Sequence, residues 1–441
     1  MKRIINADLH IHSHYSAATS PRMDLPTLAA EALRKGIELL GTGDCLHPKW
    51  LQEIRELEER DGVFYFGLED RDRDGGRRDK TTNFVLTVEV EDTRRVHHLL
   101  IVPSISKAEE LYESFSAYSS NIDSDGRPSL QLSGAEIAEH ARDAEALIGP
   151  CHAFTPWTAL YAYHDSLKEC YGDLAGYISF VELGLSADSS YADRIEELRE
   201  LTFLTNSDAH SPYPIRLARE FNRFQVEGIN FDELKAAIKR ERGRMPVLNV
   251  GFPPQEGKYN ESACIRCYRH YTLNDAITRR WRCECRGLIK KGVVDRVNEL
   301  ADCDDAQPAH RPPYLHLIPL AEIIALAVRK SPASKTVQKI WESLLTLTEF
   351  GTEITVLIGA EASTSIDDAL NPAKFGLEPD DCKRVVAAIR AFRAGEIRIL
   401  PGGGGKYGVI TLKTDQERGE GPGEGQGLGQ GQKQQLSLLN F

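Results

Sequence analysis

Short apolar runs alternate with amphipathic segments along the first 245 residues of the chain. Three segments repeat their apolar positions at helical spacing, which predicts helices at 25–35, 135–146 and 193–201. The apolar runs have the length and composition of buried strands, and they fall at 39–44, 85–91, 96–102, 148–152 and 180–183. Strands that alternate with helices predict an α/β fold, and we expect a β/α barrel with its site at the carboxyl ends of the strands.

The pattern changes beyond residue 250. A proline-rich break at 308–313 precedes segments with helical spacing at 317–328, 334–348 and 379–394. Two later stretches are dominated by Gly, Gln and Glu and can bury almost nothing, so we expect disorder at 401–405 and 415–432. The predicted domains are a barrel over 1–250, a small module over 251–312, a helical domain over 313–400 and a flexible tail over 401–441.

Paired polar residues follow two of the strand-like runs. His10 and His12 follow the first run, and Asp208 and His210 follow a run near Leu204. Residues two apart on a strand face the same way, so each pair converges on one side. Loop histidines or helix caps would explain a single pair. Two pairs so far apart in the chain favour one site, built from many strand ends, that holds divalent metals.

Other strand ends carry further candidate ligands. Glu89 and Glu91 lie on one face of their run, whereas His97 and His98 are adjacent, so at most one of these histidines reaches the site. Taken singly, each candidate could instead be a satisfied structural polar group. The predicted metal ligands are His10, His12, Asp44, Glu89, His98, His152, Asp208 and His210, with Asp8, His47 and Glu182 as possible additions.

A cluster of this kind favours hydrolysis of phosphate esters. Divalent metals lower the pKa of a bridging water toward neutrality and neutralise charge on phosphoryl oxygens. We expect two or three divalent metals, zinc before magnesium or manganese, and we assign catalysis to His10, Glu89 and Asp208. The chain has no Gly-x-Ser-x-Gly motif, and the glycines at 402–405 lack the Lys and Ser/Thr of a phosphate-binding loop.

Charge is distributed unevenly along the chain. The formal net charge of −12 over 441 residues argues, by itself, against a nucleic-acid partner. Residues 258–296, however, hold ten Lys or Arg against four acidic residues, with aromatic residues between them. This mix favours contacts with phosphates and bases, and a merely solvated charged face is the alternative. The predicted DNA-binding residues are Arg266, Arg269, Arg279, Arg280, Lys290 and Lys291.

The same basic segment contains two cysteine pairs. Cys264 and Cys267 form a Cys-x-x-Cys pair, Cys283 and Cys285 form a Cys-x-Cys pair, and fifteen residues separate the two pairs. Such pairs supply the four ligands of one structural zinc ion, and four buried free thiols are the alternative. The chain shows no apolar signal core and no run of membrane length, so we expect a soluble, cytoplasmic protein whose nine cysteines form no disulfides and which has no membrane partner.

The last residues contain a short pattern of their own. Gln435 is followed by Leu438 and Phe441 at the spacing of one helical turn, which resembles the box by which DNA repair and replication enzymes bind the sliding clamp. Only one terminal aromatic residue is present, and chance occurrence is the alternative. The position of the box at the end of a flexible tail favours docking on a clamp.

The ordered motifs of the first 245 residues resemble the polymerase and histidinol phosphatase (PHP) phosphoesterases. The resemblance rests on residues 8–12, the Gly-Thr-Gly-Asp at 41–44, Glu89, His98, His152 and the Asp-Ala-His at 208–210. It implies a distorted seven-stranded β/α barrel around two or three metals. One position departs from the family pattern, because Cys45 stands where a histidine usually follows the second-motif aspartate.

The whole arrangement, with the two cysteine pairs, the Leu-Ile-Pro-Leu-Ala-Glu-Ile-Ile at 317–324 and the Pro-Gly-Gly-Gly-Gly at 401–405, is similar to the endonuclease Q family. That resemblance implies cleavage of DNA on the 5′ side of deaminated bases (hypoxanthine, uracil, xanthine) and of abasic sites, in a nucleoid-associated prokaryotic protein. Two alternative hypotheses for the function are a PHP-type small-molecule phosphomonoesterase and a DNA-binding scaffold with vestigial metal sites.

Overall fold

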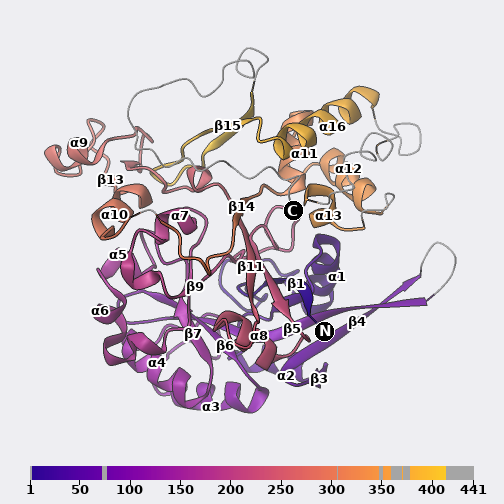
Figure 1. Ribbon diagram of the computed structural model, residues 1–441, viewed down its shortest axis with the longest axis vertical. Coiled ribbons are helices and arrows are strands. Elements are labelled where there is room, and N and C mark those ends of the chain that lie inside the picture. The colour runs from indigo at the N-terminus through magenta and orange to yellow at the C-terminus, as the bar shows by residue number, and fades with distance from the viewer. Residues whose placement is uncertain are drawn as a thin grey trace.

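In the computed structural model of the chain, residues 2–71, 77–304, 306–346, 351–358, 370 and 378–413 are described. A ring of strands with surrounding helices forms the lower part of Figure 1. A small module with the two cysteine pairs, here called the cysteine module (251–312), lies at the upper left, and a group of helices lies at the upper right. The predicted α/β class is therefore confirmed.

Seven strands form the ring. β1 (Arg3–Asp8), β2 (Leu39–Gly41) and β5 (Arg77–Glu91) are parallel neighbours, and β6 (His97–Val102) then pairs antiparallel with β5 and with β7 (Leu147–Pro150). β8 (Phe180–Glu182) and β9 (Thr202–Leu204) pair in parallel. Backbone hydrogen bonds from Ser179 to Ile148 and from His12 to Ala209 join this pair to β7 and to β1, which closes the ring.

Further strands extend the sheet outside the ring. β10 (Phe221–Val226) and β11 (Met245–Gly251) continue from β1 in antiparallel order, and β14 (Tyr314–His316) adds to β11 in parallel. On the other side, β3 (Glu58–Arg60) and β4 (Val63–Arg71) form a meander with the long strand β5, and the β4–β5 pair projects to the right in Figure 1.

Short helices cover the outside of the ring, at α1 (Leu25–Lys35), α2 (Pro48–Arg55), α3 (Ile105–Ser116), α4 (Gly134–Asp143), α5 (Leu160–Tyr163), α6 (Leu167–Tyr171), α7 (Ser189–Ala192) and α8 (Phe231–Ile238). The 3-10 turns η1 (Gly172–Tyr177) and η2 (Glu196–Leu198) lie among them, and η3 (Pro254–Glu256) follows β11 at the start of the cysteine module. The predicted helix at 25–35 is confirmed. The Asp24 side chain caps its first turn, and Gly36 ends it in the left-handed conformation.

The helix predicted at 193–201 is wrong. The structure has only the turn η2 within this span, and the Asp193 carboxylate at its start is buried 2.8 Å from the Arg311 guanidinium. Tertiary contacts such as this one override helical periodicity.

Two apolar layers hold the barrel together. One fills the ring and takes residues from every ring strand, namely Ala7, Leu39, Val85, Leu99, Leu147, Phe180 and Leu204. The other lies between the ring and its helices and continues into the helical domain. Side chains alternate along a strand, so residues an even number of positions from Val85 and Leu99 also point into the ring. Glu89 and His97 are such residues.

The cysteine module consists of β12 (Ala263–Cys264), α9 (Leu273–Thr278), β13 (Ile289–Lys290) and α10 (Val293–Leu300). The helical domain contains α11 (Leu320–Val328), α12 (Lys335–Thr346), α13 (Glu353–Ile358) and α16 (Pro379–Arg393). None of the helices in the described ranges is both long and apolar enough to cross a bilayer.

The glycine stretch at 401–405, expected to be disordered, instead lies within an ordered hairpin of β15 (Ile397–Leu400) and β16 (Val409–Leu412). Glu261 donates its backbone N–H to the Gly402 carbonyl. Gly404 has a φ of 64°, and a Cβ there would lie 2.5 Å from the carbonyl oxygen of Cys264. Glycine is therefore needed for close packing against the cysteine module rather than for flexibility. The stretch at 415–432 lies outside the described residues.

Candidate active site

Most of the polar residues predicted at strand ends meet at one end of the ring. His10 and His12 follow β1, Glu89 lies near the end of β5, and Asp208 follows β9. His97 begins β6, and because β6 runs antiparallel to β5 its first residue lies at the same end of the ring. The additional residues near this cluster are His152, after β7, and His210, after β9.

His10, His12 and Asp208 form one group of potential metal ligands, whose donor atoms all lie within 4.8 Å of one another. His12 Nε2 lies 3.3 Å from a carboxylate oxygen of Asp208, and His10 Nε2 lies 3.8 Å from the same oxygen. Both Nε2 atoms are buried and have no hydrogen-bond partner in the described part of the chain. Buried nitrogens that point at a carboxylate without bonding it suit a cation placed between them.

Glu89, His97 and His152 form a second group that shares the carboxylate of Glu89. His97 Nδ1 lies 2.6 Å and His152 Nε2 lies 3.0 Å from Glu89 Oε1. The other oxygen, Oε2, lies 3.3 Å from His12 Nε2 in the first group. Glu89 therefore stands between the two groups, as a carboxylate that bridges two metal ions does.

Two buried carboxylates lie behind the histidines and orient them. His10 Nδ1 donates to Glu182 Oε2 at 2.9 Å, and His12 Nδ1 lies 3.1 Å from Asp44 Oδ1. Both bonds turn the Nε2 atoms toward the centre of the site. The other Asp44 oxygen accepts from the backbone N–H and the hydroxyl of Ser13, both at 2.7 Å. Asp44 and Glu182 were predicted to be metal ligands. In the structure they orient His10 and His12 and do not face the centre of the site.

The structure corrects the expectation for His98. Its Nδ1 lies 2.8 Å from the Tyr171 hydroxyl and its Nε2 lies 3.4 Å from Asp92, outside the ring. His97, the inward neighbour, lies in the cluster instead. The sequence held the needed signal, because His97 has the same strand phase as Leu99 and Ile101, which belong to the core inside the ring.

Three further predicted residues lie at or beyond the edge of the cluster. Asp8 accepts backbone N–H groups from Ser207 and Ala218 and braces the loop that carries Asp208. His47 stacks on Tyr15, with ring centroids 4.2 Å apart, outside the two ligand groups. His210 is partly exposed, and its ring lies 4.3 Å from that of His12.

The electrostatic field of the cluster favours cations. Burial would lower the pKa of His12, but the carboxylates of Asp208, Asp44 and Glu89 raise it well above its ordinary value. Burial would likewise raise the pKa of Asp44, but His12 and Ser13 lower it. The carboxylates therefore stay ionised, and a field that stabilises an imidazolium also attracts a divalent cation.

The backbone is strained at three of these positions. Asp44, His152 and Asp208 have φ values of 51°, 31° and 47°. Non-glycine residues adopt this left-handed region rarely, and the strain is retained where the surrounding structure demands one side-chain direction. Each of the three residues directs a polar side chain toward His12 or Glu89.

Arg127 is a site residue that the sequence patterns did not indicate. Its guanidinium lies 3.3 Å from Glu89 Oε2, and about a third of its side chain is exposed (31%). It stands in an irregular loop between α3 and α4, where neither strand phase nor motif spacing marks it. A partly exposed guanidinium at the rim of a metal cluster can bind a phosphate oxygen.

A cavity of about 200 Å³ is linked to the loop of Asp208 through Arg219, one of its lining residues. Its wall comes from the barrel, the start of the cysteine module, the helical domain and the hairpin loop, through Leu185, Arg216, Arg219, Phe252, Glu256, Gly257, Glu322 and Tyr407. Arg219 Nε donates to the carbonyl of Ser207, the residue before Asp208, at 2.9 Å. Burial raises the pKa of Glu256 to about 9, with a contribution from Glu322, so this carboxyl is neutral near pH 7.

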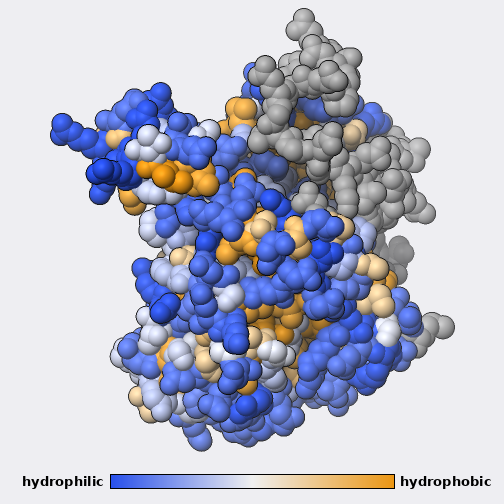
Figure 2. All heavy atoms as spheres, turned by 60° about the vertical axis from the view of Figure 1, so that its left-hand side comes forward, coloured by the Kyte–Doolittle hydropathy of each residue, from blue (hydrophilic) through white to orange (hydrophobic). Residues whose placement is uncertain are grey.

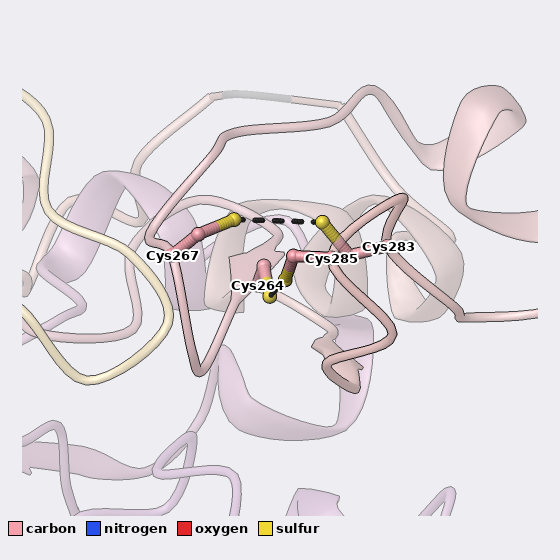
Figure 3. Close-up of side chains that lie close together, drawn as sticks. All are labelled: Cys264, Cys267, Cys283 and Cys285. Carbon is pink, nitrogen blue, oxygen red and sulfur yellow. Dashed lines mark hydrogen bonds between the residues drawn. The ribbon is translucent and has the colours of Figure 1, made fainter.

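The two cysteine pairs come together in the cysteine module (Figure 3). Cys264 Sγ lies 3.5 Å from Cys285 Sγ, Cys267 Sγ lies 3.5 Å from Cys283 Sγ, and all four sulfurs lie within 4.8 Å of one another. Four thiolates bound to one zinc ion at about 2.3 Å would lie about 3.8 Å apart in a tetrahedron. The observed separations fit one tetrahedral metal.

The basic residues predicted to contact DNA lie on the surface of this module. Arg266, Arg269, Arg279 and Arg280 are exposed, and Lys290 and Lys291 are half-buried. Arg269 and Arg279 share Glu284 as an ion-pair partner, and Lys290 lies over the Trp157 ring at 3.5 Å. Figure 2 shows this part of the molecule, at the upper left, as predominantly hydrophilic with small exposed apolar areas. The arrangement fits a surface that binds a polyanion.

Comparison with known proteins identifies relatives over nearly the whole chain. Residues 319–396 match the family of the MJ0043 C-terminal domain. The uncharacterized protein MJ0043 of Methanocaldococcus jannaschii is 45% identical over 268 residues, which cover 59% of this chain and 32% of that protein. The crystal structure of the lesion-specific endonuclease PfuEndoQ from Pyrococcus furiosus is 47% identical, with a TM-score of 0.82 and coverage of 95% and 98%. A structure of endonuclease Q with a 27-mer duplex that has an abasic lesion at the active site is 47% identical, with a TM-score of 0.83 and coverage of 96% and 99%.

Proposed function

The chain belongs to the endonuclease Q family, and from this premise we propose that it is a metal-dependent DNA repair endonuclease that cleaves one strand on the 5′ side of abasic sites and deaminated bases. The observation that carries the proposal is Glu89, which stands between two ligand groups at the end of the ring. The related structures, which cover 95% and 96% of the chain, are those of a lesion-specific endonuclease and of endonuclease Q with a duplex that has an abasic lesion at the active site.

The donor set suits two divalent cations, and we propose zinc, with magnesium or manganese as alternatives. Such a pair, when bound, lowers the pKa of a shared water and neutralises charge on the phosphodiester. The residues of the chain hold and orient this centre. His10 and His12 present Nε2 because Glu182 and Asp44 engage their Nδ1 atoms. Arg127 is positioned to bind an oxygen of the phosphate at the rim.

We assign DNA binding to the cysteine module. Its four cysteines are proposed to hold a structural zinc ion, which would fix the surface that carries Arg266, Arg279 and Arg280. Contacts of these residues with phosphates would not depend on base sequence. A DNA substrate would place the protein in the prokaryotic cytoplasm with the nucleoid.

The cavity lined by Arg219 is proposed to receive the damaged nucleotide. An enzyme that acts at a base in a duplex needs a pocket for the extruded nucleotide. Arg216 and Arg219 offer only donors, and deamination replaces a donor amino group with an acceptor carbonyl group, so the pocket favours the deaminated bases hypoxanthine, uracil and xanthine. Tyr407 offers an aromatic face for stacking.

The proposed pocket can be tested by comparing a duplex that contains deoxyinosine with one that contains an abasic site. Tyr407→Ala removes a surface on which a base stacks, and an abasic site has no base. We expect nicking at deoxyinosine to fall by about 5- to 150-fold, the effect of losing about 1–3 kcal/mol of stacking, with little change at an abasic site. Equal losses on both duplexes would place Tyr407 outside base recognition.

The carboxyl-terminal box with Gln435, Leu438 and Phe441 lies outside the described residues. We propose that it binds the sliding clamp, since two apolar side chains one helical turn apart suit a small apolar pocket. A variant without residues 433–441 is expected to nick short oligonucleotides at the wild-type rate but to lose co-elution with the clamp. Unchanged clamp binding by Leu438→Ala/Phe441→Ala would show that the box is accidental.

The proposed activity is tested with the pure protein on a labelled duplex that contains one deoxyinosine. An undamaged duplex and a phosphomonoester serve as parallel substrates. We expect a single nick on the 5′ side of the lesion that requires divalent metal, and no comparable turnover of the other two substrates. Faster turnover of the phosphomonoester would favour the small-molecule phosphatase reading instead.

A further inference from the structure

A further set of potential ligands, outside the ring cluster and the cysteine module, lies on the outer face of the β5–β6 hairpin. It consists of Asp92, in the hairpin turn, His98, on the outward face of β6, and Cys170, at the end of α6. All three side chains are buried, and one ligand atom from each lies within 4.8 Å of the others. His98 is the histidine that the ring does not use, so its burial with a carboxylate and a thiol requires its own explanation.

The spacing between Asp92 and His98 differs from that of a strong hydrogen bond. Asp92 Oδ2 lies 3.4 Å from His98 Nε2, whereas N–H···O bonds are centred near about 2.9 Å. Two ligands bound to one tetrahedral ion at about 2.0–2.1 Å lie about 3.4 Å apart. The observed separation thus matches two ligands of one small cation.

Hydrogen bonds to neighbouring groups leave one oxygen of Asp92 and one nitrogen of His98 free to bind a cation. Asp92 Oδ1 accepts the backbone N–H groups of Arg94 and Val96, both at 2.8 Å, which leaves Oδ2 to face His98. His98 Nδ1 lies 2.8 Å from the Tyr171 hydroxyl, so Nε2 is left for the cluster. Ligand histidines in metal sites are held through their other ring nitrogen in the same manner.

Close packing keeps the cluster compact. A Cβ at Gly134 would lie 2.7 Å from Cys170 Sγ and 3.2 Å from His98 Cε1, so only glycine fits at the start of α4. The mixed carboxylate, imidazole and thiol donors are those that zinc accepts.

We propose that Asp92, His98 and Cys170 bind a structural zinc ion, distinct from the cluster in the ring and from the cysteine module. Binding would use Asp92 Oδ2, His98 Nε2 and the Cys170 thiolate, and the thiol proton would pass to solvent as the S–Zn bond forms. The site does not depend on the proposed nuclease activity.

Such an ion would stabilise the segment of the barrel that contacts helix α10 of the cysteine module. It would tie α6 and the preceding loop to the β5–β6 hairpin. Arg296 of α10 donates to the carbonyls of Tyr161, in α5, at 2.8 Å and of His164, in the loop before α6, at 3.0 Å. The same short segment thus connects the proposed ion to the helix of the module.

The test counts zinc in protein produced with zinc supplementation. Elemental analysis is made on the wild type, on Cys170→Ser and on Cys382→Ser, whose thiol is also buried but belongs to no ligand group in the described residues. We expect Cys170→Ser to contain one equivalent less zinc than the wild type, and Cys382→Ser to match the wild type. The thermal midpoint of Cys170→Ser should fall further than that of Cys382→Ser.

A second measurement uses only the wild type, so it remains valid if Cys170→Ser does not fold. Crystals of the zinc-supplemented wild type are measured above and below the zinc absorption edge. We expect an anomalous difference peak among Asp92, His98 and Cys170, separate from the peaks in the ring and at the four cysteines. The absence of this peak, or a full complement of zinc in Cys170→Ser, would overturn the proposal.

Discussion

The ring cluster and the cysteine module are both built from potential metal ligands, but they are assembled in opposite ways. The ring draws ligands from His10 to Asp208, so its geometry exists only when the strands have closed. The module takes all four ligands from Cys264 to Cys285, within one short stretch of chain. A distributed site is rigid and suits chemistry, whereas a local site can fold around its metal and present a surface. The comparison therefore predicts that damage to the ring stops cleavage and that damage to the module weakens DNA binding.

The largest effect is expected for His10→Ala. Loss of a ligand from the group with His12 and Asp208 should reduce nicking by at least about 100-fold, since even the loss of a residue that only orients a ligand costs 10–100-fold. The circular dichroism spectrum and the Kd for an abasic duplex should stay close to those of the wild type. Normal cleavage by this variant would remove the ring from the chemistry.

The double variant Cys264→Ser/Cys283→Ser tests the other side of the comparison. Structural zinc supplies much of the folding free energy of a small module, so we expect loss of one equivalent of metal, partial unfolding and a weaker Kd for damaged and undamaged duplexes. If metal content, stability and affinity all stayed unchanged, the four cysteines would be ordinary buried thiols.

A smaller loss is expected when an orienting carboxylate of the ring is neutralised. Glu182→Gln keeps the size of the side chain but weakens the bond that turns His10 toward the centre, so metal affinity or kcat should fall by about 10–100-fold. Glu197→Gln is a matched control, because Glu197 bonds Tyr161 and Leu167 and contacts no ligand of the ring. Equal activity of both variants would mean that Glu182 has no part in orienting His10.

The affinity of the module surface for DNA should depend on salt. Replacing Arg279 and Arg280 with Glu removes contacts with phosphates, so the slope of log K against log salt should become shallower by about 2. Arg142→Glu, at an exposed arginine of α4 in the barrel, is the control and should leave the slope unchanged. An effect confined to damaged DNA would instead place Arg279 and Arg280 next to the lesion.

The last prediction concerns the stability of the fold rather than cleavage or DNA binding, and it is made for the dependence on pH. Burial raises the pKa of Glu220 to about 8, so the folded state keeps a proton that the unfolded chain loses near its ordinary pKa. Stability is therefore lost as the pH rises from about 4.5 to 8, by at most about 1.4 kcal/mol for each pH unit. Calorimetry from pH 5 to pH 8 should show a growing advantage of Glu220→Gln over the wild type, and parallel curves would contradict the assignment.

The sequence was sufficient to predict which cysteines come together in the module, but it predicted the residues of the ring cluster only in part. Spacing alone predicts that Cys264, Cys267, Cys283 and Cys285 converge, because a turn closes each short pair. The choice between His97 and His98 depends instead on the strand phase set by pairing of Glu91 with His97 in the β5–β6 hairpin. The prediction of His98 overlooked that phase.

Other features depend on contacts between segments that are distant in sequence. Asp44 follows β2, which ends at Gly41 and not at Asp44 as predicted, and its bonds to Ser13 and His12 place it behind the ligands. Arg127 reaches Glu89 from an irregular loop that no periodicity marks. The composition of residues 401–405 suggested disorder, because composition does not show that Glu261 and Cys264 lie close enough to need glycine opposite them.

The most direct test of the division between ring and module is single-turnover nicking of an abasic duplex over a range of protein concentrations up to saturation. We expect Asp208→Ala to bind all of the duplex and leave it uncut, and Arg279→Glu/Arg280→Glu to need more protein but to reach the wild-type rate at saturation. Cleavage by saturating Asp208→Ala, or a module variant that stays slow when all DNA is bound, would contradict the account.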